Sequence, residues 1–454
     1  MQLYTGHSID YHTGADEIMT ARKIVLTTFG SLGDLHPFIA VALQLRRHGH
    51  RPVIASSPDY REKVEGEGIE FCGVGPSVAQ VRGDLRIDEQ EFVRRTMTDK
   101  TFLLKQVTFP YLKVMYEDML DVIAGAAVVI TSTFAFSARL AAEKHAIPQI
   151  GVVLQPLMFL SPYDPPILAD AQVLSKMLRR CGPTVSAAVL QLAKSITARW
   201  TAPVAALRKE LGLPATSINP VFEGQFSEHG ALGFYSPVLG AIQPDFPRPT
   251  KLTGFLFYDA DAREDAAEGS ALAAFLSSGP SPLVFVLGSF AISNAGDFFR
   301  VSVQAASQLG RRAVIVVGSS APKSEIENLP SHVFACRYAA YSKLFPYAAA
   351  IVHQGGIGTT AQALRAGKAQ LVVPFLADQP DNAARVVRLG VARTISRGRY
   401  RAKRVARELA QLLNEPAYAN RAAVVAEQVR GEDGAGEAAI QIERVVNERQ
   451  GTVD

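Results

Sequence analysis

Cysteine is scarce in this chain. The three cysteines among 454 residues, Cys72, Cys181 and Cys336, lie far apart, and none has a second Cys or a His at the spacing of metal ligands. The spacing predicts reduced, packed thiols in a cytoplasmic protein. It gives no sign of a metal site, and we expect none.

Long apolar runs and a dense stretch of one charge are also missing. No apolar run reaches bilayer-spanning length, and residues 1–20 carry His, Asp and Glu where a signal peptide needs an unbroken apolar core. We therefore expect no transmembrane segment, and we interpret residues 1–20 as a disordered lead-in. The net charge of +4 is spread along the whole chain, without the basic stripe of a phosphate-backbone binder. Nucleic acid is therefore not an expected partner.

The length exceeds what one hydrophobic core usually supports, so two domains are expected. In each half, short apolar β-branched runs alternate with segments of helical periodicity. This alternation is typical of parallel sheets covered by helices on both faces. The predicted fold class is α/β, with two doubly wound domains that bind ligands at the carboxyl ends of their strands.

The domain boundary is predicted from proline. Three prolines in residues 243–249 stiffen the backbone and cannot continue a regular element. We place an N-terminal domain at 21–240, a linker at 241–250 and a C-terminal domain at 251–430. The remaining residues, 431–454, are expected to form a helix that packs back on the N-terminal domain.

The segment VHQGGIGTT, residues 352–360, ends one predicted strand and opens a helix. Free backbone N–H groups and the helix dipole favour an anion there, and glycines let a phosphate approach the backbone closely. His353 can add a ring N–H, and Thr359 and Thr360 can add hydroxyls. The alternative is that Gly355, Gly356 and Gly358 form only a tight strand-to-helix turn.

The next predicted strand ends in DQPDN, residues 378–382. Because parallel strands end at the same sheet edge, this segment should lie beside the Gly-rich turn. Asp378 and Gln379 offer a carboxylate and an amide to neighbouring sugar hydroxyls. Their alternative role is to cap the helix that Pro380 begins.

Residues 338–382 resemble the donor-binding signature of the inverting UDP-glycosyltransferase-like enzymes, and the bacterial branch with rhamnolipid, sterol, macrolide and glycopeptide glycosyltransferases fits best. The resemblance extends to residues 30–43, 252–259 and 286–290. It implies the GT-B fold, two Rossmann-like domains that face each other across a cleft. It also implies donor-binding roles for Gly288, Ser289, Tyr338, His353, Gly355, Gly356, Gly358, Thr359, Thr360, Asp378 and Gln379.

Within those roles, the resemblance places Gly288 and Ser289 beside the phosphates and Tyr338 near the base. Two departures concern the nucleoside. The Trp-x-Pro-Gln opening of plant relatives is replaced by residues 338–341, and the ribose-binding Glu is replaced by Ala361 or Gln362. Uridine and thymidine donors therefore both stay open.

The segment GDLHP, residues 33–37, follows the first predicted strand. Sugar transfer needs a base that takes the proton of the attacking hydroxyl. Asp34 matches the position of the base in the resembling family. The alternative for Asp34 is a loop carboxylate that caps a helix beginning at Pro37. His36 is the competing base, or a partner that orients Asp34 or the acceptor.

The acceptor side is predicted from residues 154–168, an apolar, Pro-rich segment without periodicity. Leu157, Met158, Phe159 and Tyr163 are its candidate contacts, and similar loops in rhamnolipid-type relatives favour a hydrophobic small-molecule or lipid acceptor. The alternative is that these side chains pack as ordinary core. The basic residues 397–404 are compatible with peripheral membrane contact, although a solvated helix start is the more usual interpretation.

These features predict an inverting glycosyltransferase that uses a nucleoside diphosphate-sugar as co-substrate, with no metal and no other cofactor. A nucleotide-sugar epimerase of the same fold is one alternative, and it would need no apolar acceptor loop. A non-catalytic accessory protein is the other. It would have no use for Asp34 together with Asp378 and Gln379.

Overall fold

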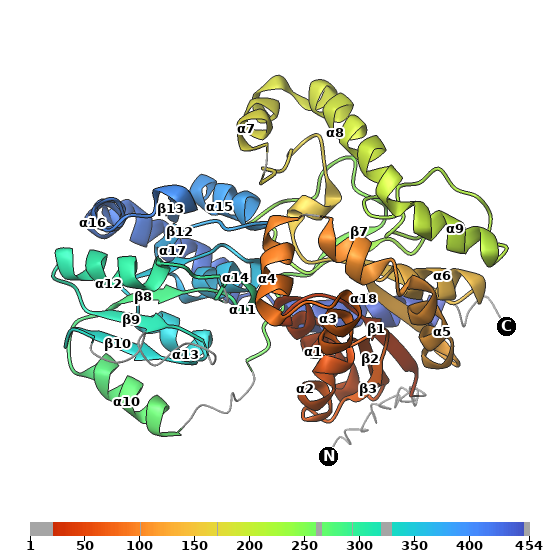
Figure 1. Cartoon of the computed structure of the whole chain (residues 1–454), viewed down its shortest axis with the longest axis horizontal. Helices are drawn as coiled ribbons and strands as arrows, with labels where there is room; N and C mark the ends of the chain where they lie inside the picture. Colours follow the sequence, from red (N-terminus) through yellow and green to blue (C-terminus); the bar gives the residue numbers. More distant parts are fainter. Residues whose placement is uncertain are drawn as a thin grey trace, which may run out of the picture.

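A computed structural model describes residues 21–99, 101–169, 171–259, 266–292, 294–318 and 329–448. The predicted lead-in, 1–20, lies outside the described residues, as does the end of the chain, 449–454. Figure 1 shows the described part as two α/β halves, with the chain passing from one to the other.

The first sheet has seven parallel strands within the described residues, in the order β3-β2-β1-β4-β5-β6-β7. The strands are β1 Lys23–Thr27, β2 Arg51–Ser56, β3 Glu70–Gly73, β4 Val128–Ser132, β5 Gln149–Val153, β6 Ala231–Gly233 and β7 Thr250–Leu252. In β1, Val25 packs with α5 (Leu112–Ile123) and α6 (Phe136–Lys144) on one face, whereas Ile24 and Leu26 pack with α1 (Leu32–Arg47) and α18 (Gly434–Glu448) on the other. Burial on both faces explains why the strand is apolar throughout.

The helices of this half are α1 Leu32–Arg47, α2 Arg61–Glu65, α3 Val78–Leu85, α4 Glu89–Thr98, α5 Leu112–Ile123, α6 Phe136–Lys144, α7 Gln172–Cys181, α8 Pro183–Ala198 and α9 Ala202–Glu210. A π-helix covers Leu103–Thr108, and a short 3-10 helix covers Pro156–Phe159.

The second sheet has six parallel strands in the described part of the chain, in the order β10-β9-β8-β11-β12-β13. The strands are β8 Leu283–Val286, β9 Ala313–Val316, β10 Val333–Cys336, β11 Ala350–His353, β12 Gln370–Val372 and β13 Ala392–Thr394. The helices are α10 Ala266–Ser277, α11 Ser289–Ile292, α12 Phe298–Gln308, α13 Tyr341–Leu344, α14 Ile357–Ala366, α15 Gln379–Arg388, α16 Ala402–Asn414, α17 Pro416–Arg430 and α18 Gly434–Glu448. The two sheets give the predicted pair of doubly wound α/β units.

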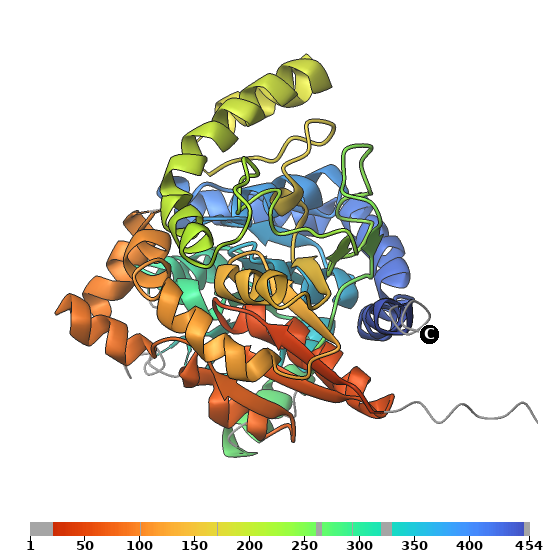
Figure 2. The same ribbon diagram turned by 90° about the vertical axis from the view of Figure 1, so that its right-hand side faces the viewer.

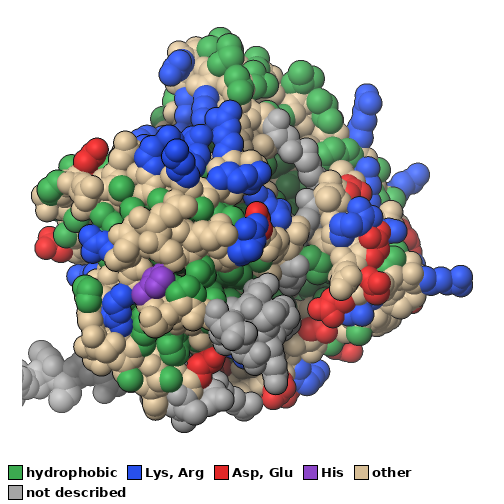
Figure 3. All heavy atoms as spheres, turned by 60° about the vertical axis from the view of Figure 1, so that its left-hand side comes forward, with side chains coloured by type: hydrophobic (Ala, Val, Ile, Leu, Met, Phe, Trp, Pro, Cys, Tyr) green, Lys and Arg blue, Asp and Glu red, His purple; other side chains and the backbone are tan. Residues whose placement is uncertain are grey.

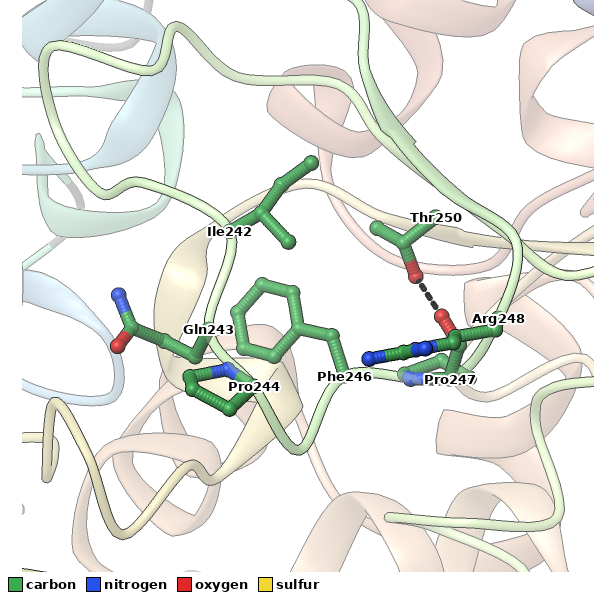
Figure 4. A pocket seen from close by; sticks show the side chains of 7 residues that line it. All are labelled: Ile242, Gln243, Pro244, Phe246, Pro247, Arg248 and Thr250. Carbon is green, nitrogen blue, oxygen red and sulfur yellow. Dashed lines mark hydrogen bonds between the residues drawn. The ribbon is translucent and has the colours of Figure 1, made fainter.

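The crossing between the sheets comes later than the predicted linker, 241–250. The strand β7 follows these residues and pairs with β6 in the first sheet. The prolines therefore lie in a loop before the last strand of that sheet, where Pro244 and Pro247 line a surface pocket (Figure 4). Thr250 Oγ1 donates a hydrogen bond to Pro247 O across this loop.

The last described helix, α18, packs on the N-terminal half. Ile442 and Val446 join the core that α1 forms with the first sheet. Glu443 Oε1 accepts from His48 Nδ1 at 2.8 Å and contacts His50 Nε2 at 3.1 Å. Among the described helices, none has both the length and the apolar character that a bilayer crossing requires.

Candidate active site

Asp34 lies in the first turn of α1, not in a loop before the helix. The helix begins at Leu32, and Pro37 lies inside it. The sequence analysis placed the helix start at Pro37 because proline favours a first turn. Ser31 takes that function as the N-cap, since its side chain accepts from the N–H of Gly33.

The Asp34 carboxylate is held in place by Ser31. Asp34 Oδ2 accepts from the Ser31 backbone N at 2.7 Å and from Ser31 Oγ at 3.0 Å. A Cβ at Gly30 would come within 2.3 Å of Oδ2, so the carboxylate requires glycine there. No hydrogen bond within the described residues falls on Oδ1, which is left for a proton. Burial raises the pKa of Asp34, although the bonds from Ser31 oppose the rise.

His36 points away from this carboxylate. Its ring lies 5.0 Å from the ring of Tyr258, in the chain segment that follows β7. Burial, and then the charge of Lys63, lowers the pKa of His36 to about 4. Its Nε2 is buried without a hydrogen-bond partner in the described structure. Ser31, not His36, therefore orients Asp34, and the lowered pKa makes His36 a weaker base than an ordinary histidine.

The segment 353–360, here the donor loop, joins β11 to α14 at the carboxyl end of the second sheet. His353 is fully buried. Its Nδ1 accepts from the Gly355 N–H at 3.1 Å, and its Nε2 lies 3.0 Å from Gln370 Oε1. Burial lowers the pKa of His353 to about 4, so the ring is neutral near pH 7. Both nitrogens are engaged, so the expected free N–H for a diphosphate is not present, and the ring fixes Gly355 instead.

Three glycines of the site are required by close packing. Gly355 has φ +93°, and a Cβ there would meet Val372 Cγ1 at 2.8 Å. A Cβ at Gly356 would meet Gln354 Nε2 at 2.8 Å, and one at Gly288 would meet the same atom at 2.3 Å. Gln354 thus joins the donor loop to the end of β8. The exposed Gly358 faces open space, where backbone can approach a ligand.

Asn382 links the donor loop to the DQPDN segment. Its Nδ2 donates to Gly355 O at 3.0 Å and to Asp378 Oδ2 at 2.6 Å. Burial raises the pKa of Asp378 to about 7, against the bond from Asn382. The two motifs predicted to meet at one sheet edge are therefore joined by one side chain.

The side-chain oxygen of Gln379 binds backbone groups of the loop before α15. Its Oε1 accepts from the backbone N–H groups of Phe375 at 2.7 Å and Leu376 at 3.1 Å. The expected sugar contact through this oxygen is therefore taken by the protein. Asp378 is the N-cap of α15, but its side chain makes no capping hydrogen bond. The Asp378 carboxylate therefore does not cap α15, as the alternative interpretation required.

Several oxygen atoms around the donor loop lack partners. Gln354 Oε1, Thr360 Oγ1 and Asn382 Oδ1 are buried and receive no hydrogen bond in the described structure. Thr359 Oγ1 accepts only a long bond, 3.4 Å, from Gln354. Unsatisfied buried acceptors are costly, and the hydroxyls of a sugar are donors that would satisfy them.

Tyr338 lies just after β10 and is 49% exposed, so its ring is accessible to a ligand base. Tyr341 is turned inward and stacks on Phe345, with ring centroids 4.5 Å apart. Ser289 begins α11, directly after Gly288, and its side chain lies outside what the structure describes.

Asp34 and Asp378 approach each other across the two halves. The negative charge of Asp34 contributes to the raised pKa of Asp378. A contribution of this kind requires that the two carboxylates share one region of the cleft. The candidate base and the candidate sugar-binding carboxylate are therefore close enough for their charges to interact.

The acceptor segment, residues 154–168, gives most of its apolar side chains to the core. Met158 and Phe159 are 8% and 6% exposed, and Leu157 packs against the same cluster. The Phe159 ring stacks on Phe246 with centroids 3.8 Å apart. These positions do not fit an acceptor-lining role for Met158 and Phe159. Tyr163, at 51%, is exposed.

An ionic cluster that the sequence analysis missed binds the acceptor segment to α15. Arg385 contacts Asp381 at 2.6 Å and also pairs with Asp164. Arg179 of α7 donates to Asp381 at 3.1 Å, and Arg388 donates to Asp164 at 2.9 Å. Burial opposes ionisation of Asp164, but Arg388 and Arg385 lower its pKa to about 2. The cluster fixes the acceptor segment to the helix that begins at the DQPDN segment.

The sequence predicted no role for two further residues of the site, Gln354 and Asn382. Both lie inside motifs that the sequence singled out, and only their amide side chains, which can donate and accept hydrogen bonds, could have indicated a role. Their importance follows from contacts between segments far apart in sequence, since Gln354 lies against Gly288 and Asn382 binds Gly355. Within the described residues, no group of His, Cys, Asp or Glu is arranged to hold a metal ion.

Two protein-family models match the chain. The N-terminal domain of glycosyltransferase family 28 matches residues 24–156. The C-terminal domain of erythromycin biosynthesis protein CIII-like proteins matches residues 303–445. The first match contains Asp34 and the second contains the donor loop, so each half of the cleft falls within one model.

Known glycosyltransferases resemble the chain over most of its length. O-mycaminosyltylonolide 6-deoxyallosyltransferase of Streptomyces fradiae is 29% identical over 440 residues, which cover 93% of this chain and 97% of the relative. Vancomycin aglycone glucosyltransferase of Amycolatopsis orientalis is 28% identical over 373 residues, covering 81% and 84%.

A solved structure shows the same fold. The glycosyltransferase VinC, in complex with dTDP, superposes with a TM-score of 0.62 at 19% identity and covers 94% of this chain and 100% of its own. The chain is therefore a glycosyltransferase with the GT-B fold, and its two halves resemble the two domains that the matching models describe.

Proposed function

We propose that the chain moves a hexose from UDP-hexose or dTDP-hexose to a hydroxyl group of an apolar small-molecule or lipid acceptor, with inversion at the anomeric carbon. The observation that carries this proposal is the electrostatic interaction of Asp34 with Asp378, one from each half of the chain. A single displacement needs a base on the acceptor side and sugar-holding groups on the donor side, and these carboxylates supply both.

In the proposed donor complex, the diphosphate lies at the N-terminus of α14. Free backbone N–H groups and the helix dipole favour its negative charge, and Gly358 leaves room for it. The same groups stabilise the charge that develops on the leaving diphosphate. Asp378 and the unsatisfied oxygens of Gln354 and Asn382 accept hydrogen bonds from the sugar hydroxyls. The proposal involves no metal ion.

Asp34 acts as the base through Oδ1. Ser31 holds Oδ2, so the carboxylate presents its other oxygen in a fixed direction. A raised pKa makes Asp34 a stronger base than an ordinary aspartate. The proton of the acceptor hydroxyl passes to Asp34 as the hydroxyl oxygen attacks the anomeric carbon.

The choice of substrates rests on the relatives and on chemistry. The two relatives are named for transfer to O-mycaminosyltylonolide and to vancomycin aglycone, and VinC was solved with dTDP. They support a small-molecule acceptor and leave dTDP and UDP as the donor nucleotides. A membrane lipid is the second class of acceptor in the proposal.

The test is a panel of UDP- and dTDP-sugars incubated with the protein without an acceptor. Slow hydrolysis releases nucleoside diphosphate, which is measured without knowledge of the acceptor. We expect release from at least one donor and strong loss of that release in Asp34→Asn. Absence of hydrolysis and of calorimetric binding for every donor would contradict the proposal.

A further inference from the structure

The hairpin of α7 and α8 turns apolar side chains outward. Surface helices ordinarily face their apolar stripe toward the core. Here Ser175 and Ser186 are buried with Leu178 and Leu190, while larger apolar side chains are exposed. We call the exposed set the hairpin surface. Its side chains are between 48% and 75% exposed, and they are Val173, Leu174, Met177, Val185, Leu192 and Ile196.

The hairpin stands away from the two sheets. Figures 1 and 2 show α7 and α8 at the top of the molecule, beyond the helices that cover the first sheet. Residues 185, 192 and 196 of α8 follow one another at spacings of seven and four, which places them on one side of the helix. These three residues therefore form an apolar stripe along α8, on a projecting part of the molecule.

The charge of this region has one sign. Residues 171–209 contain no Asp or Glu, although the whole chain has 43 of them. The same residues contain seven basic side chains, more than the net charge of +4 of the whole chain. They are Lys176, Arg179, Arg180, Lys194, Arg199, Arg208 and Lys209. Figure 3 shows exposed hydrophobic side chains at the top of the molecule, with Lys and Arg side chains gathered near them.

Three of the basic side chains serve the fold, and three border the hairpin surface. Arg179, Lys194 and Arg208 pair with acidic residues of neighbouring segments. Lys176, Arg180 and Arg199 are exposed and form no ion pair with the described residues. Lys176 and Arg180 are one turn apart on α7, and Arg199 follows Ile196 by three residues.

We propose that the hairpin surface docks on an anionic lipid bilayer. An apolar stripe bordered by Lys and Arg, without acidic residues, fits the interface between acyl chains and negative headgroups. A second copy of this chain would bring like charges together, which disfavours self-association through this surface. The docking is independent of the transfer reaction and concerns a different surface from the cleft.

The position of the hairpin relates docking to the cleft. Residues 161–169 lead directly into α7, and Arg179 Nε donates to Pro165 O at 2.7 Å. The backbone N of Ile167 donates to Asp381 of α15 at 2.9 Å. A docked hairpin therefore brings the acceptor segment to the lipid surface.

The test measures co-sedimentation of the full chain with vesicles of phosphatidylglycerol and phosphatidylcholine, and with vesicles of phosphatidylcholine alone. We expect binding to the anionic vesicles that weakens as salt is added.

Replacing three border cations by Glu should weaken that binding on the order of 100-fold. The variant is Lys176→Glu, Arg180→Glu, Arg199→Glu. The control places the same charge change on exposed sites elsewhere and should bind like the wild type. It is Arg47→Glu, Arg86→Glu, Arg311→Glu.

A second variant removes the apolar contribution and keeps every charge. The variant is Val173→Ser, Met177→Ser, Leu192→Ser, Ile196→Ser. We expect its binding to the anionic vesicles to be weaker by about 10-fold or more. Circular dichroism melting checks that each variant is folded, which exposed substitutions should not disturb. Three outcomes overturn the proposal. The first is equal binding of the wild type to both kinds of vesicle. The second is a control variant that loses as much binding as the charge variant. The third is a dimer in sedimentation that the apolar variant dissociates.

Discussion

The donor loop and the acceptor segment follow strands of the two sheets at equivalent ends, but their side chains have different fates. In the donor loop, His353, Gln354 and Thr360 are buried, and oxygen atoms of Gln354, Thr360 and the nearby Asn382 lack partners in the described structure. In the acceptor segment, Met158 and Phe159 enter the core, and Asp164 joins an ionic cluster. The candidate donor side thus keeps unsatisfied polar groups, whereas the acceptor side is mainly structural and leaves little specific chemistry exposed.

The largest expected effect separates chemistry from binding. Asp34→Asn keeps the shape of the side chain but removes the base, so turnover should fall by about 10²- to 10⁴-fold. The affinity for UDP or dTDP should stay unchanged, since the donor loop lies in the other half. Initial rates of nucleotide release and calorimetric titration measure the two quantities. The control is Asp59→Asn, which changes an exposed carboxylate near the same sheet edge. If Asp34→Asn turned over as fast as the wild type, Asp34 would have no part in the mechanism.

The second prediction concerns the acceptor segment. Phe159→Ala should lower the free energy of unfolding by about 3–5 kcal/mol, because it empties a stacked, buried position. Tyr163→Ala should change it by about 0.5 kcal/mol or less, because Tyr163 is half exposed. Chemical denaturation measures both. A small effect of Phe159→Ala would show that this side chain is not part of the core and return it to the acceptor pocket.

The third prediction concerns how His353 acts. His353→Ala should lower both the stability of the ligand-free protein and the affinity for nucleoside diphosphate, each by about 1–3 kcal/mol. The reason is that the ring holds the Gly355 N–H and so shapes the donor loop. Thermal melting and calorimetry provide the two values. A loss of affinity with unchanged stability would instead indicate a direct contact with the phosphate.

The smallest expected effect is the pH dependence of Asp378. Its pKa is about 7 in the folded chain against an ordinary 3.8, so the folded state keeps a proton that the unfolded chain loses. Stability is therefore greatest at low pH for this group and falls as pH rises through about 7. Between about pH 5 and pH 8 the wild type should lose about 1–2 kcal/mol more than Asp378→Asn, allowing for solvent screening. Parallel pH profiles of the two proteins would refute the raised pKa.

The sequence predicted the sheets and the donor motifs because these depend on local patterns. Apolar β-branched runs mark buried strands, and Gly355 marks a turn that only glycine permits. The predicted start of α1 at Pro37 was wrong. Ser31 and Asp34 cap the helix together, and this capping outweighs the preference of proline for a first turn. The ionic cluster was missed because Asp164 and Arg385 are more than two hundred residues apart. Which apolar side chains of the acceptor segment enter the core depends on distant partners such as Phe246.

Proton NMR of donor hydrolysis tests the central claim most directly. The protein is incubated with an α-linked donor such as UDP-glucose or its dTDP counterpart, and the anomeric signals of the released sugar are followed from the first minutes. Single displacement by a water molecule that Asp34 deprotonates predicts the β-anomer first, followed by slow mutarotation. Initial release of the α-anomer would contradict the inverting mechanism, and a wild-type rate retained in Asp34→Asn would contradict the base.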